Sequence, residues 1–97
     1  MKLTEVERIR MGLRLRDIRL QRVISVRELS SRTGISEGHL SNIEHGGKNV
    51  SLDAIVALVR VLDVSLDYVV LGVRPTMSSW GLVLRSDDEL ESMILID

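Results

Sequence analysis

Side chains that commonly carry catalysis or bind metals are scarce in this chain. His39 and His45 are the only histidines, and neither has a His or Glu four residues away, the spacing at which a helix presents two metal ligands together. There is no Cys, which excludes a Cys-ligated zinc finger, a disulfide framework and a thiol enzyme. Without a nucleophile and base pair or a metal-ligand cluster, we predict that the chain is not an enzyme and holds no metal or cofactor.

Charge is distributed unevenly along the chain. Residues 1–48 hold ten Lys or Arg and six acidic residues, whereas residues 49–97 hold three Arg and eight acidic residues. The halves therefore carry +4 and −5, although the whole chain carries −1. Because contact with phosphates depends on the local field of one face, the basic first half keeps nucleic acid among the candidate ligands. An ordinary solvated surface is the alternative explanation.

The first helix has a capping signal at its start. Thr4 and Glu7 have the spacing of a capping box, so we expect a helix from this point to about Arg22. Gly12 weakens a helix locally and is an alternative start.

Two short helices separated by a glycine follow. Residues 25–28 form a second capping box, and Gly34 can take the left-handed conformation that ends a helix. Ser36 is a good N-cap for the next helix, which Gly46 and Gly47 end. The sequence thus predicts a helix, a turn and a helix between residues 25 and 47.

Two further helices complete the first domain. Ser51 or Asn49 caps the fourth helix, and Ser65 caps a short fifth helix that ends before Gly72, with Pro75 closing the domain. The apolar residues of the fourth helix cover more than half of its circumference, so we expect it to be almost entirely buried. They are Leu52, Ile55, Val56, Leu58, Val59 and Leu62.

The last part of the chain has a different pattern. Apolar residues alternate over residues 80–85, which predicts a short strand. Ser86 and the three acidic residues 87–89 then precede an apolar helix. We therefore expect an all-α fold of five helices in residues 1–74, with a strand and helix extension in residues 75–97.

No stretch of the sequence has the length of a membrane span. The apolar run Val69–Val73 is far below the ~20 residues required. The N-terminus also lacks the apolar core of a signal peptide. We expect a cytoplasmic protein with no membrane contact.

Residues 12–72 contain a specific set of residues at fixed spacings: Leu15, Ile18, Arg19, Ser25, Glu28, Leu29, Thr33 to Ser36, Leu40 to Gly46, Ser51, Leu52, Leu62 to Val69 and Gly72. With this set, the stretch resembles the Cro and phage-repressor (XRE-type) family of helix-turn-helix transcription regulators. The resemblance implies a five-helix, repressor-like domain in a prokaryote or phage. It also implies a homodimer on a palindromic DNA operator, with the third helix in the major groove.

Four positions of the third helix correspond to those that the family uses on bases: Glu37, Gly38, Ser41 and Asn42. They lie opposite Leu40 and Ile43, which we expect in the core. The amide of Asn42 can bond N6 and N7 of adenine together. Glu37 either accepts from the N4 amino group of cytosine or acts only as a partner of the helix dipole. Asn42 as a merely solvated residue is also an open alternative.

Candidate phosphate contacts surround this helix: Arg16, Ser25, Arg27, Ser36, His45, Lys48 and Asn49. For each arginine, a solvated surface position is an equal alternative. Val26 departs from the family, which often has a DNA-contacting Gln there. The resemblance also places Arg19 and Glu44 where family members form an ion pair that braces the third helix.

Dimerisation is expected through the fifth helix and the extension. A lone strand needs a partner, and the same strand of a second copy would supply one across a twofold axis. The residues expected at this interface are Tyr68, Val69, Leu71, Trp80, Leu82, Leu84, Leu90, Met93 and Ile94. A disordered extension, or one packed within its own chain, is the alternative.

A different function is also open. The chain could keep the helix-turn-helix fold and bind a protein, as an antitoxin or the target of an anti-repressor does. Val26, Glu37 and Gly38 weaken the DNA surface, and the acidic, apolar extension suits a regulatory protein partner.

Overall fold

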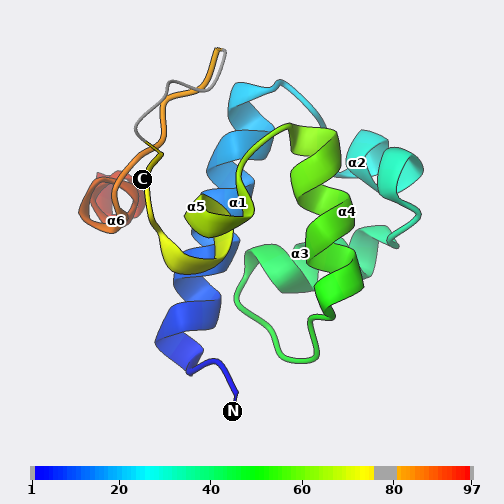
Figure 1. Cartoon of the computed structure of the whole chain (residues 1–97), viewed down its shortest axis with the longest axis horizontal. Helices are drawn as coiled ribbons and strands as arrows, with labels where there is room; N and C mark the ends of the chain where they lie inside the picture. Colours follow the sequence, from blue (N-terminus) through cyan, green and yellow to red (C-terminus); the bar gives the residue numbers. More distant parts are fainter. Residues whose placement is uncertain (1, 76–80, 97) are drawn as a thin grey trace.

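The computed structural model describes residues 2–75 and 81–96, and helices form all of the regular structure in these ranges. The elements are α1 (Glu5–Gln21), α2 (Val26–Thr33), α3 (Glu37–Glu44), α4 (Leu52–Leu62), α5 (Leu66–Leu71) and α6 (Asp87–Ile96). Figure 1 shows α1 between α4 on one side and α6 on the other. The predicted all-α fold is confirmed. None of the described helices combines the length and apolar character needed to cross a membrane.

The start of α1 is the capping box at Thr4. The amide of Glu7 donates to the Thr4 hydroxyl at 3.1 Å, and the amide of Thr4 donates to the Glu7 carboxylate at 3.0 Å. Hydrogen bonds from the Thr4 backbone and hydroxyl lower the pKa of Glu7. Gly12 is therefore not the start of the helix. It is buried, and a Cβ there would lie 2.5 Å from the carbonyl oxygen of Glu44, so the lack of a side chain allows α1 and α3 to approach closely.

Serine hydroxyls begin the next four helices. The side chains of Ser25, Ser36, Ser51 and Ser65 each accept from the amide three residues further on, at 3.0 to 3.1 Å. These bonds satisfy amides that have no partner within the helix. The predicted helix starts are confirmed, and Ser51 rather than Asn49 caps α4.

The core lies between α1 and the helices that pack on it. Its residues are Met11, Leu15, Ile18, Ile24, Leu29, Leu40, Ile43, Ala54, Ile55, Leu58, Leu62, Val64, Tyr68 and Val69. Leu40 and Ile43 of α3 are both buried, as predicted. Burial of this apolar surface supplies the main driving force for folding.

The prediction that α4 is almost entirely buried is wrong. Leu52 is 69% exposed, and Val56 and Val59 are only partly buried. The helix contacts α2 and α5. Its buried positions are Ala54, Ile55, Leu58 and Leu62. It is therefore an amphipathic helix, because its partners cover one side of it.

The strand predicted over residues 80–85 is not formed in residues 81–85, the part that the structure describes. Side chains of the helical domain take the place of a partner strand. The amide of Gln21 both donates to the carbonyl of Val83 and accepts from its N–H, each at 2.8 Å. The hydroxyl of Tyr68 donates to the carbonyl of Arg85 at 2.7 Å. These bonds satisfy three of the backbone groups of the predicted strand.

The helix predicted after the acidic residues is confirmed as α6. Ser86 and Glu89 form a capping box at its start, with the amide of Ser86 donating to Glu89 at 3.2 Å and the amide of Glu89 donating to the Ser86 hydroxyl at 3.3 Å. The backbone amide of Ser86 and its hydroxyl, the latter at 3.0 Å, both donate to the Glu89 carboxylate. These two bonds, the one from the backbone most strongly, lower the pKa of Glu89. Leu90 of this helix is buried.

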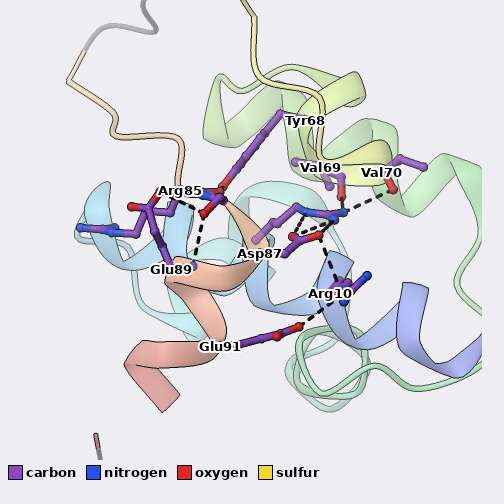
Figure 2. Close-up of polar contacts among 10 residues, drawn as sticks. Arg10, Tyr68, Val69, Val70, Arg85, Asp87, Glu89 and Glu91 are labelled. Carbon is purple, nitrogen blue, oxygen red and sulfur yellow. Dashed lines mark hydrogen bonds and ion pairs between the residues drawn. The ribbon is translucent and has the colours of Figure 1, made fainter. Parts of the chain in front are cut away.

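Partly buried polar contacts hold the extension on the helical domain. The guanidinium of Arg14 bonds both carboxylate oxygens of Asp87 and also donates to the carbonyls of Val69 and Val70 at 3.1 and 3.4 Å. Figure 2 shows these two carbonyls beside Asp87, at the start of α6. One arginine thus joins α1, the end of α5 and the start of α6.

Further charged groups surround this contact. Arg10 pairs with Asp87 and Glu91, and Arg85 pairs with Asp17 at 2.7 Å. Figure 2 shows Arg10 between Asp87 and Glu91, and Tyr68 pointing at Arg85. Burial raises the pKa of the Tyr68 hydroxyl to about 12, and the neighbouring Asp17 carboxylate adds to this effect.

Candidate nucleic-acid interface

The four predicted base-contacting residues share the outer face of α3. Glu37, Gly38, Ser41 and Asn42 are all exposed, whereas the opposite side of the helix is buried in the core. The capping bond from the amide of His39 to Ser36 fixes the start of this helix. The arrangement presents a short polar surface with hydrogen-bonding groups at its centre.

A buried ion pair attaches the end of α3 to α1. Nε and Nη2 of Arg19 bond the two carboxylate oxygens of Glu44 at 2.7 and 3.0 Å, and both side chains are at most 10% exposed. The third guanidinium nitrogen donates to the carbonyl of Ile24 at 3.0 Å. Two parallel bonds between planar groups restrict rotation as well as distance, so this pair orients α3 on the domain.

A second contact that holds the end of α3 on α1 was not predicted. Nε of Arg8 donates to the carbonyl of Gly46 at 3.1 Å, and Gly46, at a φ of 80°, lies against Ile9 so closely that a Cβ would be 2.7 Å from it. The loop after α3 is thereby held on the first turns of α1. The periodicity of α1 contained the signal, because the α3-facing positions recur at spacings of four and three: Arg8, Gly12, Leu15 and Arg19.

The side chain of Asn42 is exposed but not free. Its Nδ2 donates to the carbonyl of Lys48 at 3.3 Å, and the amide group lies directly over Gly47. The backbone N–H of Gly47 also donates to the carbonyl of Asn42 at 2.8 Å. This contact could not be predicted from local sequence, because it depends on the path of the loop between α3 and α4.

Most of the predicted phosphate-contacting residues lie at helix ends beside α3. Ser25 and Arg27 are exposed at the start of α2, and Ser36 is exposed at the start of α3. Three more are exposed just after α3: His45, Lys48 and Asn49. Nδ1 of His45 lies 2.6 Å from the carbonyl of Ser41. Lys2 was not predicted, but it lines a hollow of about 700 Å³ together with Lys48 and Asn49.

Arg16 lies in different surroundings. It is exposed on α1 and borders a hollow of about 140 Å³ between α1 and α6, whose other lining residues include Leu13, Leu20, Met93 and Ile94. Its position is therefore beside the extension.

The residues expected at a dimer interface fall into three groups. Tyr68, Val69 and Leu90 are buried within the single chain, and Leu82 and Leu84 pack partly buried against its core. Leu71, Met93 and Ile94 are exposed by 68%, 44% and 47%. Trp80 lies outside the described residues.

Comparisons with known proteins agree with this architecture. A family model of helix-turn-helix domains, HTH_3, matches residues 15–69, more than half of the chain. This match confirms the resemblance. The chain is also similar to an uncharacterized HTH-type transcriptional regulator, y4dL, of Sinorhizobium fredii, with 38% identity over 52 residues. That similarity covers 54% of this chain and 26% of the relative, so the chain spans about a quarter of the relative's length. The extension with α6 lies outside the family match.

Proposed function

The chain belongs to the HTH_3 family of helix-turn-helix domains, whose members are DNA-binding transcription regulators, and we propose that it represses transcription by binding a palindromic DNA operator as a homodimer. The observation that carries this proposal is the exposed polar face of α3, which the buried pair of Arg19 and Glu44 holds in one orientation. A rigidly held helix of this kind fits the major groove of DNA. Such a regulator acts by binding DNA in the cytoplasm of a prokaryote. The family assignment therefore also supports a non-enzymatic role.

The four residues of this face have different roles in the proposal. Asn42 contacts adenine through its amide, and Glu37 accepts from the N4 amino group of cytosine. Ser41 bonds a base edge, and Gly38 allows the helix backbone to approach the DNA closely. On DNA that lacks a cytosine at this position, the Glu37 carboxylate only repels the phosphates. Glu37 therefore contributes discrimination between sequences rather than affinity.

Phosphates are contacted from both ends of α3 in this proposal. Arg27 and Lys48 supply positive charge, and the structure gives neither of these described side chains an ionic partner. The helix starts at Ser25 and Ser36 present backbone amides, and His45 and Asn49 add polar contacts. Arg16 is the weakest candidate, because it borders the hollow beside α6.

Selection from a random pool of double-stranded DNA tests this function directly. We expect the full chain to enrich a sequence with twofold symmetry, and the affinity for that sequence to fall steeply as salt rises. The DNA-binding proposal would be contradicted if the chain enriched no sequence, or if its affinity for DNA did not depend on salt.

One observation favours a second function, a module that binds a regulatory protein as an antitoxin or the target of an anti-repressor does. The start of α6 exposes the acidic residues Asp88 and Glu89, and its later turns expose Met93 and Ile94 beside the hollow against α1. A partner with a basic rim and an apolar centre would complement this surface. The DNA selection separates the two functions, because a pure protein-binding module would enrich no DNA sequence.

A further inference from the structure

We propose that Gly47 is a specificity-determining residue, because its missing side chain leaves the space in which the amide of Asn42 is held ready to contact a base. This inference rests on the proposed function, in which Asn42 contacts adenine. It assigns a role in base recognition to a loop residue that follows α3 and need not touch DNA itself.

The contacts around Asn42 define the space. A Cβ built on Gly47 would overlap Oδ1, Cγ and Nδ2 of Asn42, which are all three atoms of its terminal amide. The same amide donates from Nδ2 to the carbonyl of Lys48, and the main chains are joined by the bond from Gly47 to Asn42. The amide is therefore packed on the backbone of the loop.

This packing fixes the orientation of the amide without using up its bonding capacity. A carboxamide has two N–H donors and an oxygen that can accept. The carbonyl of Lys48 occupies one donor of Asn42, which determines which end of the amide is nitrogen. One donor and the oxygen remain, and adenine needs one donor and one acceptor from its partner. A side chain ordered before binding also loses less conformational freedom on binding.

Gly47 is not required for the conformation of the loop. Its φ lies outside the left-handed region, unlike that of Gly46 at 80°. An alanine at position 47 is therefore compatible with the backbone, and the overlap falls only on the end of the Asn42 side chain. The change Gly47→Ala should displace the Asn42 amide and leave the helices in place.

A double-mutant cycle on the operator selected from random DNA tests the inference. The dissociation constants of the parent, Gly47→Ala, Asn42→Ala and the double variant are measured on that operator and on every single-base change of it. We expect Gly47→Ala to lose about tenfold in discrimination at the same base pair as Asn42→Ala. The double variant should lose no more than Asn42→Ala alone, because the two changes remove one interaction.

The outcomes separate this inference from the proposed function. If the parent enriches no DNA sequence, the proposed function fails, and this inference fails with it. If Asn42→Ala loses discrimination but Gly47→Ala keeps the parent's profile, the inference alone is overturned. Equal weakening by Gly47→Ala on all sequences would also overturn it, because that result indicates a contact of the loop with phosphates.

A measurement on the free parent protein keeps the inference testable even if Gly47→Ala does not fold. The packing predicts nuclear Overhauser effects between the side-chain amide protons of Asn42 and the α protons of Gly47. Their presence supports the fixed amide, and their absence in the folded parent would overturn the inference without any use of DNA.

Discussion

Arg14 and Asp87 form a two-bond ion pair across the boundary between the helical domain and the extension. Nε and Nη2 of Arg14 lie 3.0 and 2.9 Å from the two carboxylate oxygens of Asp87. The Arg14 side chain is only 5% exposed and that of Asp87 is 28% exposed. Because the same guanidinium also bonds the carbonyl of Val69 at the end of α5, the extension contributes to the stability of the helical domain.

Replacing Arg14 by Ala should lower the free energy of unfolding by about 2–3 kcal/mol, because a mostly buried carboxylate and helix-end carbonyls lose their donors. Urea unfolding measures this loss. Arg10→Ala is the matched control, since Arg10 pairs with the same Asp87 from an exposed position, and we expect a loss below about 1 kcal/mol. Equal losses for the two variants would contradict the role given to Arg14.

Removing Arg19 should be more costly. Arg19→Ala leaves the 6% exposed carboxylate of Glu44 unpaired, and we expect a loss of about 3 kcal/mol or more in the free energy of unfolding. Arg32→Ala removes an exposed pair with Glu28 within one helix and should cost about 0.3–0.5 kcal/mol. Thermal unfolding compares the two, and an Arg19→Ala variant that melts with the parent would refute the bracing of α3 by this pair.

How far the sequence predicts this fold depends on whether a signal is local. The serine caps bond an amide only three residues away, so Ser25, Ser36, Ser51 and Ser65 marked their helices correctly. The alternation after residue 80 was a real pattern, but its interpretation as a strand failed. The backbone of Val83 bonds Gln21, which is distant in the sequence and offers a side chain instead of a ladder.

In the candidate site, too, local features could be predicted from the sequence, whereas contacts between residues distant in the sequence could not. The exposure of Glu37 and Ser41 could be predicted from the period of α3, because every position on a helix has a defined face. The contact of Asn42 with Lys48 could not, because it depends on how the loop after α3 returns to the domain. The pair of Arg14 and Asp87 was also missed, since nothing in either local sequence identifies the other.

Phosphate contacts should be visible in the salt dependence of DNA binding. Arg27→Ala and Lys48→Ala should each weaken binding to all DNA sequences, and each should reduce the slope of log affinity against log salt by about one. Arg60→Ala is the matched control, because Arg60 is exposed on α4, outside the proposed interface. A slope that stays unchanged in Arg27→Ala or Lys48→Ala would exclude that residue from the phosphate contacts.

Tyr68 should make stability depend on alkaline pH. Its pKa is raised from 10.0 to about 12 in the folded chain, so the protonated hydroxyl is favoured by folding. This contribution is fully present below pH 10 and is lost as pH rises through about 12. We expect the parent to lose more stability over this interval than Tyr68→Phe does.

Ultraviolet titration provides a direct check, because the chain contains a single Tyr. Ionisation at the ordinary tyrosine pKa in the folded protein would contradict the burial of this hydroxyl. Tyr68→Phe should itself cost about 1 kcal/mol at neutral pH, through the lost bond to the carbonyl of Arg85.

The proposed homodimer can be tested at apolar residues that the single chain leaves exposed. Truncation after Arg74 is a poor test, because it removes Asp87 and so deprives the buried Arg14 of its carboxylate partner. Substitution of an exposed residue avoids this problem. Leu71 is 68% exposed at the end of α5, so Leu71→Asp should leave the helical domain folded. In a dimer that buries Leu71, the new charge would be desolvated without a partner, which strongly disfavours association.

Sedimentation of Leu71→Asp at micromolar concentration should therefore show a monomer where the parent is a dimer. Leu52→Asp is the matched control, because Leu52 is 69% exposed at the start of α4 and lies outside the proposed interface.

In a dimer, the α3 helices of the two subunits must lie about 34 Å apart to enter successive turns of the major groove. Loss of the dimer should thus weaken binding to a full palindrome much more than binding to a single half-site. If Leu71→Asp stays dimeric with the parent's affinity for the palindrome, the end of α5 is not part of the interface. Met93 and Ile94 on α6 would then be the remaining exposed residues of the proposed dimer interface within the part of the chain that the structure describes.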